Sequence, residues 1–394
     1  MAARLGHTIK AILFQVHSVV GLVLALLVSL IALTGAIMSF EDEIVHHLNA
    51  DIMQVAPRQA PALMPDALVA RLKAAQDLGK VSAVTLSSDP FAAVHVRFGR
   101  DEQGGRPASL YVDPYDARVL GSLRGEAFFA TVRQLHRWLL IPGDGKGWGR
   151  PITGTIALGL IVMLVSGLVL RWPRRADSVK MWLKPNLGLG GRALHRSLHT
   201  VIGTWVLPIY LAMTLTGLYF SFEWYKDGVT WLLARPHVTA AKMTTKPLRA
   251  AGHAEPASPI GFDRAWTAFQ REEGDRFSRA LLTLPAGPGA AIRIRSWGKA
   301  SLLETTRDEF RIDAITGQLV SAERYADKTF GETIIAAIYD IHRGEIIGWP
   351  GKLAFMIAAI LMPLFAVTGI LLYLSRRRLR RPAQPPLGRL VPGE

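Results

Sequence analysis

The chain has no cysteine among its 394 residues. This absence excludes disulfide bonds, thiolate zinc sites, iron–sulfur clusters and covalent haem attachment through a Cys-x-x-Cys-His motif. Acidic and basic side chains are also scarce in four long apolar stretches, although a fifth of the residues overall are charged. A metal or cofactor in this protein must therefore be held by His, Met or oxygen ligands.

The four apolar stretches are long enough to cross a lipid bilayer. They cover residues 11–40, 152–170, 201–222 and 353–374. A helix of about 20 apolar residues, rising ~1.5 Å per residue, spans the hydrocarbon core. The first stretch is too long for a cleaved signal peptide and runs into Glu41 without a small-residue cleavage site. We therefore expect four membrane-spanning helices, the first of them an uncleaved anchor.

The basic residues predict the orientation in the membrane. The segments 1–10, 171–198 and 375–394 contain fifteen Lys and Arg residues but only two acids, Asp177 and Glu394, and so carry most of the net charge of +15. Such a bias is typical of cytoplasmic segments. We expect both termini in the cytoplasm of a bacterial inner membrane, both long soluble segments in the periplasm, and an Arg-rich tail in contact with anionic lipid. The excess of positive charge does not indicate nucleic-acid binding, because it follows the membrane topology.

The chain contains two similar halves. His17 precedes Thr34-Gly35 in the first apolar stretch, and His199 precedes Thr216-Gly217 in the third, with eighteen residues from His to Gly in both. The second and fourth stretches follow Leu135-His136-Arg137 and Ile341-His342-Arg343, and end with Ser166-Gly167 and Thr368-Gly369. These parallels predict an internal duplication.

Each soluble segment predicts a small α+β module. Helical patterns at 66–75 and 261–273 precede alternating runs at 93–97 and 291–295. The turn at Asp116-Ala117-Arg118 lacks the glycine of its counterpart Thr316-Gly317-Gln318, so the two modules need not share one role. The predicted fold is a membrane all-α four-helix bundle plus two periplasmic α+β modules related by internal duplication.

The predicted domains follow the chain in order. Residues 1–40 form the N-terminal tail and first helix, 41–135 the first module, 136–172 a periplasmic-face His and the second helix, 173–198 a basic cytoplasmic loop, 199–224 the third helix, 225–341 the second module, 342–374 a further periplasmic-face His and the fourth helix, and 375–394 a basic tail.

Four histidines occupy equivalent positions, two at each face of the membrane: His17 and His199 at the cytoplasmic face, His136 and His342 at the periplasmic face. Ionisable residues in a membrane are costly and are functional candidates by default. Facing histidines on the helices of a bundle are typical ligands of b-type haem. Without cysteine, two non-covalent haem b groups are the leading expectation, with a His-only zinc site or a proton relay as alternatives.

We predict that His17 and His199 ligate the iron of one haem, and His136 and His342 that of the other. His195, one helical turn before His199, is an alternative or additional inner ligand. Arg137 and Arg343 are candidates to pair with haem propionates, or are plain interfacial arginines. The remaining histidines are expected to be ordinary surface residues: His7, His46, His47, His95, His237 and His253.

The order and spacing of these motifs resemble the PepSY-associated transmembrane family, which includes iron-regulated inner-membrane proteins and ferric-siderophore reductases. The likeness covers roughly residues 10–378. It rests on the His-x-x-x-Gly and Thr-Gly motifs of the odd helices, on Leu194-His195-Arg196, on the His-Arg pairs, and on Tyr111-Val112-Asp113-Pro114 and Ile312-Asp313-Ala314 in the soluble segments. The resemblance implies a di-haem reductase that passes electrons to a periplasmic Fe(III)-siderophore and releases Fe(II).

On this reading a cytoplasmic or quinol donor supplies the electrons, and no side chain acts as acid or base. Tyr339, Asp340 and Arg343 are substrate-side candidates. One difficulty is distance, because eighteen helical residues span about 27 Å, so either the outer histidines reach into the bundle or another group relays electrons. The rival function is a non-redox membrane sensor or protease-regulating protein whose PepSY modules bind peptides. A transporter is disfavoured because no acid lies in the middle of the four stretches, and a homodimer is compatible with the sequence.

Overall fold

The structure is a computed structural model of the chain. It describes residues 2–75, 79–99, 109–143, 145–172, 178–234, 261–284, 291–301 and 303–379, with side chains from residue 8 onward. His237, His253, the side chain of His7, the arginines at 174 and 175, and the Pro-rich tail lie outside this part. The chain divides into a helical unit (residues 1–39, 133–222 and 353–394) and a sheet unit (residues 40–132 and 223–352).

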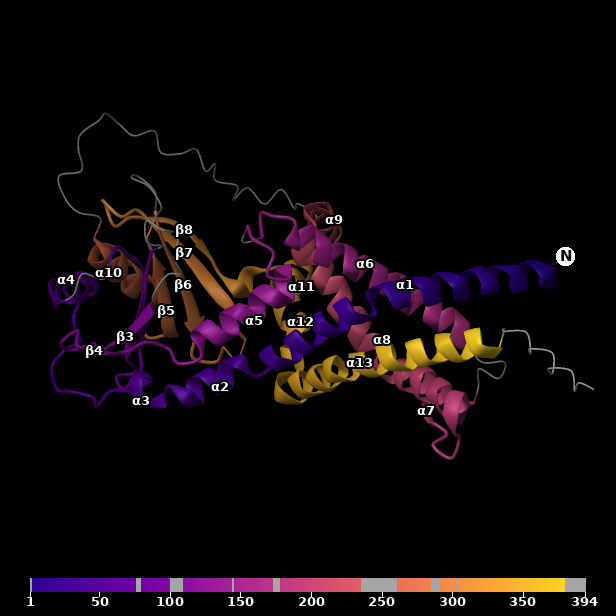
Figure 1. The fold of residues 1–394 in the computed structure, drawn as a ribbon. Coiled ribbons are helices and arrows are strands. Elements are labelled where there is room, and N and C mark those ends of the chain that lie inside the picture. Colours follow the sequence, from indigo (N-terminus) through magenta and orange to yellow (C-terminus); the bar gives the residue numbers. More distant parts are fainter. Residues whose placement is uncertain are drawn as a thin grey trace, which may run out of the picture. The chain divides into compact units, whose positions relative to one another are not determined.

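The helical unit contains four long apolar helices, as predicted. They are α1 (Ala2–Met38), α6 (Gly149–Arg171), α8 (Gly191–Ser221) and α13 (Gly348–Leu379) (Figure 1). The short α7 (Val179–Leu183) precedes α8, and the C-terminal end of α5 (Glu126–Trp138) also belongs to this unit. The four helices are long and apolar enough to cross a membrane, so the chain is a multi-pass membrane protein.

All four membrane helices contribute to one apolar core. Its buried centre is formed by Val206 and Tyr210 of α8 with Ala358 and Met362 of α13, and side chains of α1 and α6 pack around it. The hydroxyl of Tyr210 donates to the carbonyl of Ala358 at 2.7 Å. Because the bilayer offers no water, such pairing of polar groups inside the bundle is required for stability.

The basic helix ends gather at one end of this unit. The guanidinium of Arg376, near the end of α13, lies 4.2 Å from the ring centroid of Phe14 in the first part of α1. The end of α6 contacts His17 of α1, and the end of α13 contacts His199 of α8. The helices therefore alternate in direction, as the charge pattern predicts.

The sheet unit contains eight strands and several short helices. In chain order it holds α2 (Glu41–Leu48), α3 (Ala50–Met53), α4 (Pro65–Ala75), β1 (Val81–Ser87), β2 (Val94–Phe98), β3 (Ser109–Val112), β4 (Val119–Gly121), most of α5, α9 (Glu223–Leu233), α10 (Phe262–Glu273), β5 (Phe277–Thr283), β6 (Ile292–Gly298), β7 (Arg307–Ile312), β8 (Leu319–Glu323), α11 (Phe330–Ala336), α12 (Ile338–Arg343) and two 3-10 turns.

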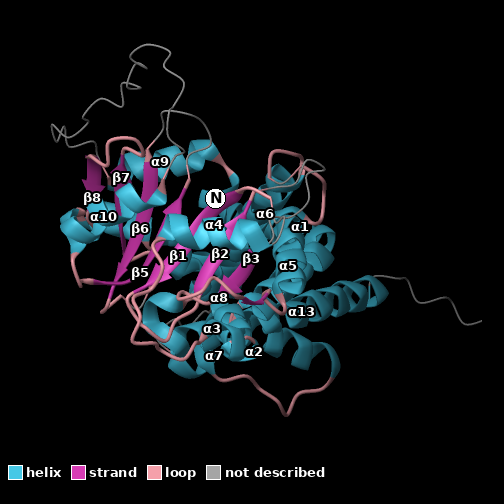
Figure 2. Cartoon of the chain, turned by 90° about the vertical axis from the view of Figure 1, so that its left-hand side faces the viewer, coloured by secondary structure: helices cyan, strands magenta, loops and turns pink. Residues whose placement is uncertain are grey.

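The strands form one antiparallel sheet in the order β4-β3-β2-β1-β5-β6-β7-β8 (Figure 2). The two predicted modules are therefore not separate, because β1 pairs directly with β5, with Thr85 opposite Leu281. One hydrophobic core serves both halves, since α4 and α10 cover the same face and bury Leu68 and Phe269 together with strand residues. Neither four-stranded half could bury this face as completely alone.

The two turns that differ in sequence have the same backbone conformation. Ala117 has φ 63° and Gly317 has φ 70°, both left-handed. In each turn this residue donates its N–H to the carbonyl of an aspartate four residues earlier, Asp113 at 3.0 Å or Asp313 at 2.9 Å. The missing glycine therefore does not alter the turn, but it places an L-residue in a conformation costing about 1–2 kcal/mol.

Replacing Ala117 by Gly is expected to change the free energy of unfolding of the sheet unit by less than about 0.5 kcal/mol, because relief of the strained positive φ is offset by the loss of a methyl group buried in the core. The reciprocal change Gly317→Ala should lower it by about 1 kcal/mol, since the added methyl group meets only ordinary contacts with Arg264 at 3.6 Å. Thermal unfolding of the detergent-solubilised protein measures both. Equal shifts in the same direction would contradict this explanation.

Candidate histidine site in the helical unit

His17 and Ser166 form a contact between α1 and α6. The Nδ1 atom of His17 lies 2.9 Å from the Oγ atom of Ser166. That hydroxyl also lies 2.5 Å from the carbonyl oxygen of Val162 in its own helix. A hydroxyl has one proton, and a carbonyl oxygen can only accept. The Ser166 proton is therefore donated to Val162, and the His17 ring must donate from Nδ1–H.

His199 makes the equivalent contact between α8 and α13. Its Nδ1 atom lies 2.9 Å from the Oγ1 atom of Thr368, whose hydroxyl donates to the carbonyl of Leu364 at 2.6 Å. The same reasoning assigns the proton of His199 to Nδ1. In both histidines the Nε2 lone pair is left available, which is the form that ligates a metal.

The two rings face the same region of the bundle. The ring centroids of His17 and His199 are 6.3 Å apart, with an interplanar angle of 76°. A metal between them would be held by the Nε2 atom of each ring. The two residues predicted as a pair are thus neighbours, and their role as ligands stays a prediction.

His136 lies on α5 and reaches into the bundle beside α1. Its Nδ1 atom is 2.8 Å from the carbonyl oxygen of Ile31 and 3.2 Å from the hydroxyl of Thr34. The carbonyl can only accept, so Nδ1 is again the protonated nitrogen. His136 thus lies beside residues 31–35 of α1, fourteen to eighteen residues from His17, a rise of about 21–27 Å. Its distance from the inner pair therefore stays close to that expected from the helix ends.

Three pairs of a hydroxyl residue and a glycine contact these rings: Ser166-Gly167, Thr34-Gly35 and Thr368-Gly369. A methyl group on Gly167 would lie 3.1 Å from His17, one on Gly35 3.2 Å from His136, and one on Gly369 3.7 Å from His199. These glycines therefore leave room for an imidazole, rather than chiefly for a porphyrin or a helix backbone. Sequence reasoning singled out the pairs as helix-end motifs but missed their contact with the histidines.

The donor set fits haem better than zinc. Within the described residues there is no group of three or more His, Cys, Asp or Glu able to hold a metal ion. A structural zinc ion needs four ligands and a catalytic one usually three from the protein. A haem would need only one or two ligands from the protein, and His17 and His199 could supply them.

Aromatic side chains continue from His199 toward the middle of the bundle. The ring of His199 lies 5.6 Å from that of Phe365, and Phe365 lies 5.9 Å from Tyr210, both measured between centroids. Tyr210 is eleven residues beyond His199 on α8, a rise of about 16 Å. Phe365 and Tyr210 therefore lie between the level of the inner histidines and the level of His136. They are candidates for the group expected from the sequence to relay electrons over this distance.

His195, the alternative inner ligand, and Arg137, the candidate propionate partner at the periplasmic face, both stay predictions. His195 lies one turn from His199 on α8 and is half-buried, but the ring contact with His17 is made by His199. Arg137 is exposed, and its guanidinium lies 5.0 Å from the Trp138 ring centroid.

His342 and Arg343 belong to the sheet unit, and the predicted pairing of His342 with His136 stays a prediction. Arg343 forms ion pairs with Asp42 at 2.5 Å and Glu345 at 3.6 Å. Lys352 extends this cluster through Glu43 at 2.5 Å.

The three substrate-side candidates differ in exposure. Tyr339 is 45% exposed, whereas Asp340 is fully buried and accepts a hydrogen bond from Thr305. Burial raises the pKa of Asp340. Asp340 therefore does not present its carboxylate at the surface, and its expected contact with a substrate was wrong.

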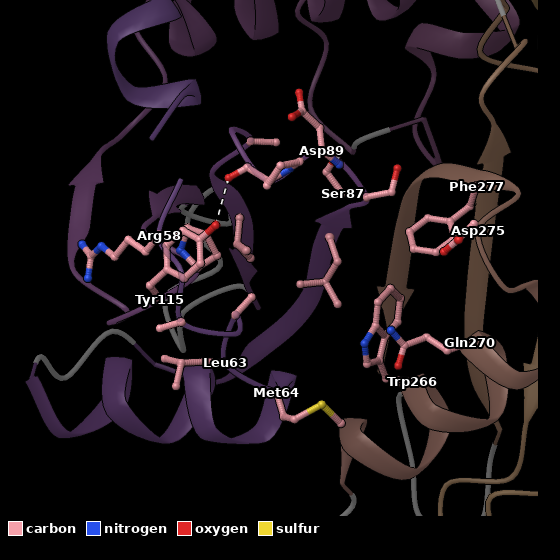
Figure 3. A pocket seen from close by; sticks show the side chains of 18 of the residues that line it. Arg58, Leu63, Met64, Ser87, Asp89, Tyr115, Trp266, Gln270, Asp275 and Phe277 are labelled. Carbon is pink, nitrogen blue, oxygen red and sulfur yellow. Dashed lines mark hydrogen bonds between the residues drawn. The ribbon is translucent and has the colours of Figure 1, made fainter. Parts of the chain in front are cut away.

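A cleft lies between the two halves of the sheet unit. It has a volume of about 610 Å³, a size typical of small-molecule sites. Trp266, Gln270 and Phe277 form one wall, and Tyr115 lies opposite, with its hydroxyl donating to the carbonyl of Pro90 (Figure 3). Arg58 at its edge pairs with the two aspartates of the neighbouring turn.

His95 is not an ordinary surface histidine, contrary to expectation, whereas His46 and His47 are exposed as expected. The His95 ring stacks on Tyr111 at 4.7 Å, and its Nε2 atom is buried without a hydrogen-bond partner. Burial, helped by the charge of Arg97, lowers the pKa of His95 to about 4. The alternating pattern of β2 could not reveal the burial of His95, because Tyr111, the residue that stacks on it, belongs to the neighbouring strand β3.

The fold is that of a membrane protein with four helices able to cross the bilayer and one extended antiparallel sheet. The chain matches the family described as the PepSY-associated TM region over residues 14–376. It therefore belongs to this family, as the sequence motifs predict. No curated protein matched the chain.

The buried neutral state of His95 makes the sheet unit sensitive to acid. Its folded pKa of about 4 is below the unfolded value of 6.5, so this contribution is fully present above pH 6.5 and is lost as the pH falls toward 4. We expect a loss on the order of 1–3 kcal/mol, seen as a falling melting temperature.

The replacement His95→Leu should reduce the loss over this pH range, because no proton can then bind at that position. His47→Leu, at an exposed position, is the matched control and should leave the pH profile unchanged. Identical profiles for His95→Leu and the unmodified protein would refute the explanation.

Proposed function

We propose that this protein is a di-haem membrane reductase that moves electrons outward and reduces a periplasmic Fe(III)-siderophore, releasing Fe(II). The observation that carries the proposal is the state of His17, His199 and His136, whose Nδ1–H groups are held by hydroxyl or carbonyl acceptors. Their Nε2 lone pairs are thereby kept for a metal. Family membership supports the proposal only at the level of a membrane protein with PepSY-associated helices.

Haem b, when bound, supplies one-electron chemistry. The residues of the chain bind it, orient it and exclude water. His17 and His199 are the proposed inner axial ligands, and His136 with His342 the outer ones. Ser166, Thr368 and Thr34 keep the rings in one tautomer and orientation. The apolar core around Tyr210 separates the two levels from solvent.

The contacts within the helical unit also support a membrane orientation and an internal duplication of the chain. The basic ends of the helices lie at the level of His17 and His199, and we assign this level to the cytoplasmic face of a bacterial inner membrane. A cytoplasmic or quinol donor would then reduce the inner site. The matched contacts His17–Ser166 and His199–Thr368, and the matched turns at Ala117 and Gly317, support an internal duplication.

Siderophores bind Fe(III) through hard oxygen donors and hold Fe(II) much less well. Addition of one electron to the bound iron therefore weakens its binding by the siderophore. Fe(II) is released, and the siderophore remains intact. The electron comes from the cytoplasmic or quinol donor, so the reaction needs no acid or base from the chain.

Haem content tests the proposal directly. The purified protein should show a Soret band that shifts on addition of dithionite, with two haem groups per chain. His17→Ala and His199→Ala should each lose the inner haem and retain the outer one, because axial ligation fails. His195→Ala is the matched control, one turn away on the same helix, and should retain both. Absence of a Soret band, or loss of haem in His195→Ala alone, would reject the assignment.

The hydroxyl that holds His17 can be tested separately. Ser166→Ala removes the acceptor of Nδ1–H and should weaken retention of the inner haem roughly tenfold, as is typical for an outer-shell partner. Ser29→Ala is the control, because the Ser29 hydroxyl is also buried and, among the described residues, bonds the carbonyl of Ala25 and no histidine. Haem transfer to apomyoglobin measures retention. Equal rates for both variants would show that the Ser166 contact has no role in ligation.

A second candidate function is a non-redox membrane sensor or protease-regulating protein that binds peptides. The cleft beside Trp266 favours it, because its volume of about 610 Å³ and aromatic walls suit a short peptide segment. This candidate predicts structural histidines and no Soret band, so the haem measurement separates the two functions.

A further inference from the structure

The two faces of the sheet differ in character. Alternation along the strands directs Val84, Val96, Leu282 and Ile294 to the face covered by α4 and α10. The opposite face is rich in arginine. We call it the arginine face and define it by six residues on four strands: Arg97, Arg279, Arg293, Arg295, Arg307 and Arg311.

Four of the six arginines have partners within the sheet unit. Arg279 pairs with Glu304 and lies 4.2 Å from the Trp297 ring centroid. Arg295 and Arg311 share Glu309, at 3.6 and 3.5 Å. Arg307 donates to the backbone carbonyl of Glu304 at 2.9 Å.

The guanidinium groups of the other two arginines have no hydrogen bond or ion pair to any residue that the structure describes. Arg97 is exposed and Arg293 is half-buried. In addition, Arg293 stands directly opposite Arg311 in the β6–β7 pair. Like charges opposite one another destabilise a sheet, and the single carboxylate of Glu309 offsets only one of the three positive charges of Arg293, Arg295 and Arg311.

The two unpaired arginines lie in one row across the sheet. Arg97 is opposite Ala83, Ala83 is opposite Thr283, and Thr283 is opposite Arg293. Three strand spacings separate the two backbones by about 14 Å. The side chains between them, Ala83 and Thr283, are small. Ala83 packs with Leu281 and Trp297 in a buried apolar cluster on this face, so a short apolar strip separates the two cations.

We propose that the arginine face binds a negatively charged Fe(III) chelate whose donor groups are carboxylates. A guanidinium binds a carboxylate through two parallel hydrogen bonds, and two guanidinium groups on strands about 14 Å apart suit a compact chelate with several outward-facing carboxylates. A neutral or cationic hydroxamate chelate gains nothing from them. This inference rests on the proposed function for the role of the ligand, but its binding does not require haem.

Binding can be measured without reduction by using gallium. Ga(III) has the same charge as Fe(III) and nearly the same radius but is not reduced under these conditions. Ga(III)-citrate therefore reports binding whether or not haem is present. Isothermal titration calorimetry is performed on the full-length protein in nanodiscs of zwitterionic lipid, which removes competing anionic headgroups. The double variant Arg97→Gln/Arg293→Gln should bind at least ~10-fold more weakly. Arg71→Gln, on the exposed side of α4, is the matched control and should bind as the unmodified protein does.

Binding should also weaken as salt is raised, because the arginines are partly exposed. Two results would overturn the inference: equal binding by the double variant, or equally tight binding of a cationic gallium trihydroxamate. Metal-free citrate binding as tightly as Ga(III)-citrate would overturn the assignment to a chelate. Arginine-dependent binding of Ga(III)-citrate in a protein that lacks a Soret band would reject the reductase function and leave the anion site intact.

Discussion

The single proton of a hydroxyl group governs the candidate site. A serine or threonine in a membrane helix donates that proton to a carbonyl of its own helix, since no water is present to satisfy either group. Ser166 and Thr368 both do so. Each can then only accept from the histidine that it faces, which determines the tautomer of His17 and His199 and keeps Nε2 available for a metal.

The same constraint explains why polar residues occur in pairs inside the bundle. An isolated imidazole in the bilayer would pay for its desolvation without compensation. A glycine next to each hydroxyl lets the ring approach the neighbouring helix closely, as at Gly167 and Gly35. Helix packing and ring orientation are therefore coupled, and the histidines hold pairs of helices in register even before any cofactor is considered.

In the sheet unit the corresponding constraint is the central strand pair. Because β1 and β5 pair, the two halves share one core on the face covered by α4 and α10. The same pairing aligns the rows of the opposite face, so that Arg97 and Arg293 fall in one row although 196 positions separate them in the chain. A site made in this way belongs to neither half alone. It arises from the register of the pairing.

Much of this architecture was determined by the sequence itself. Long apolar runs and clustered arginines suffice for four membrane helices, because the bilayer requires a fixed length and polarity. The repeated spacing of His17 and His199 likewise predicts an inner pair, and these two rings do lie together. Periodicity located α4, α10, β2 and β6 of the sheet unit but not its other strands and helices. Only tertiary structure decided which hydroxyl holds which histidine, that Asp340 and His95 are sheltered, and that the two modules merge into one sheet. These features depend on contacts between segments far apart in the chain, and periodicity within one segment carries no information about them.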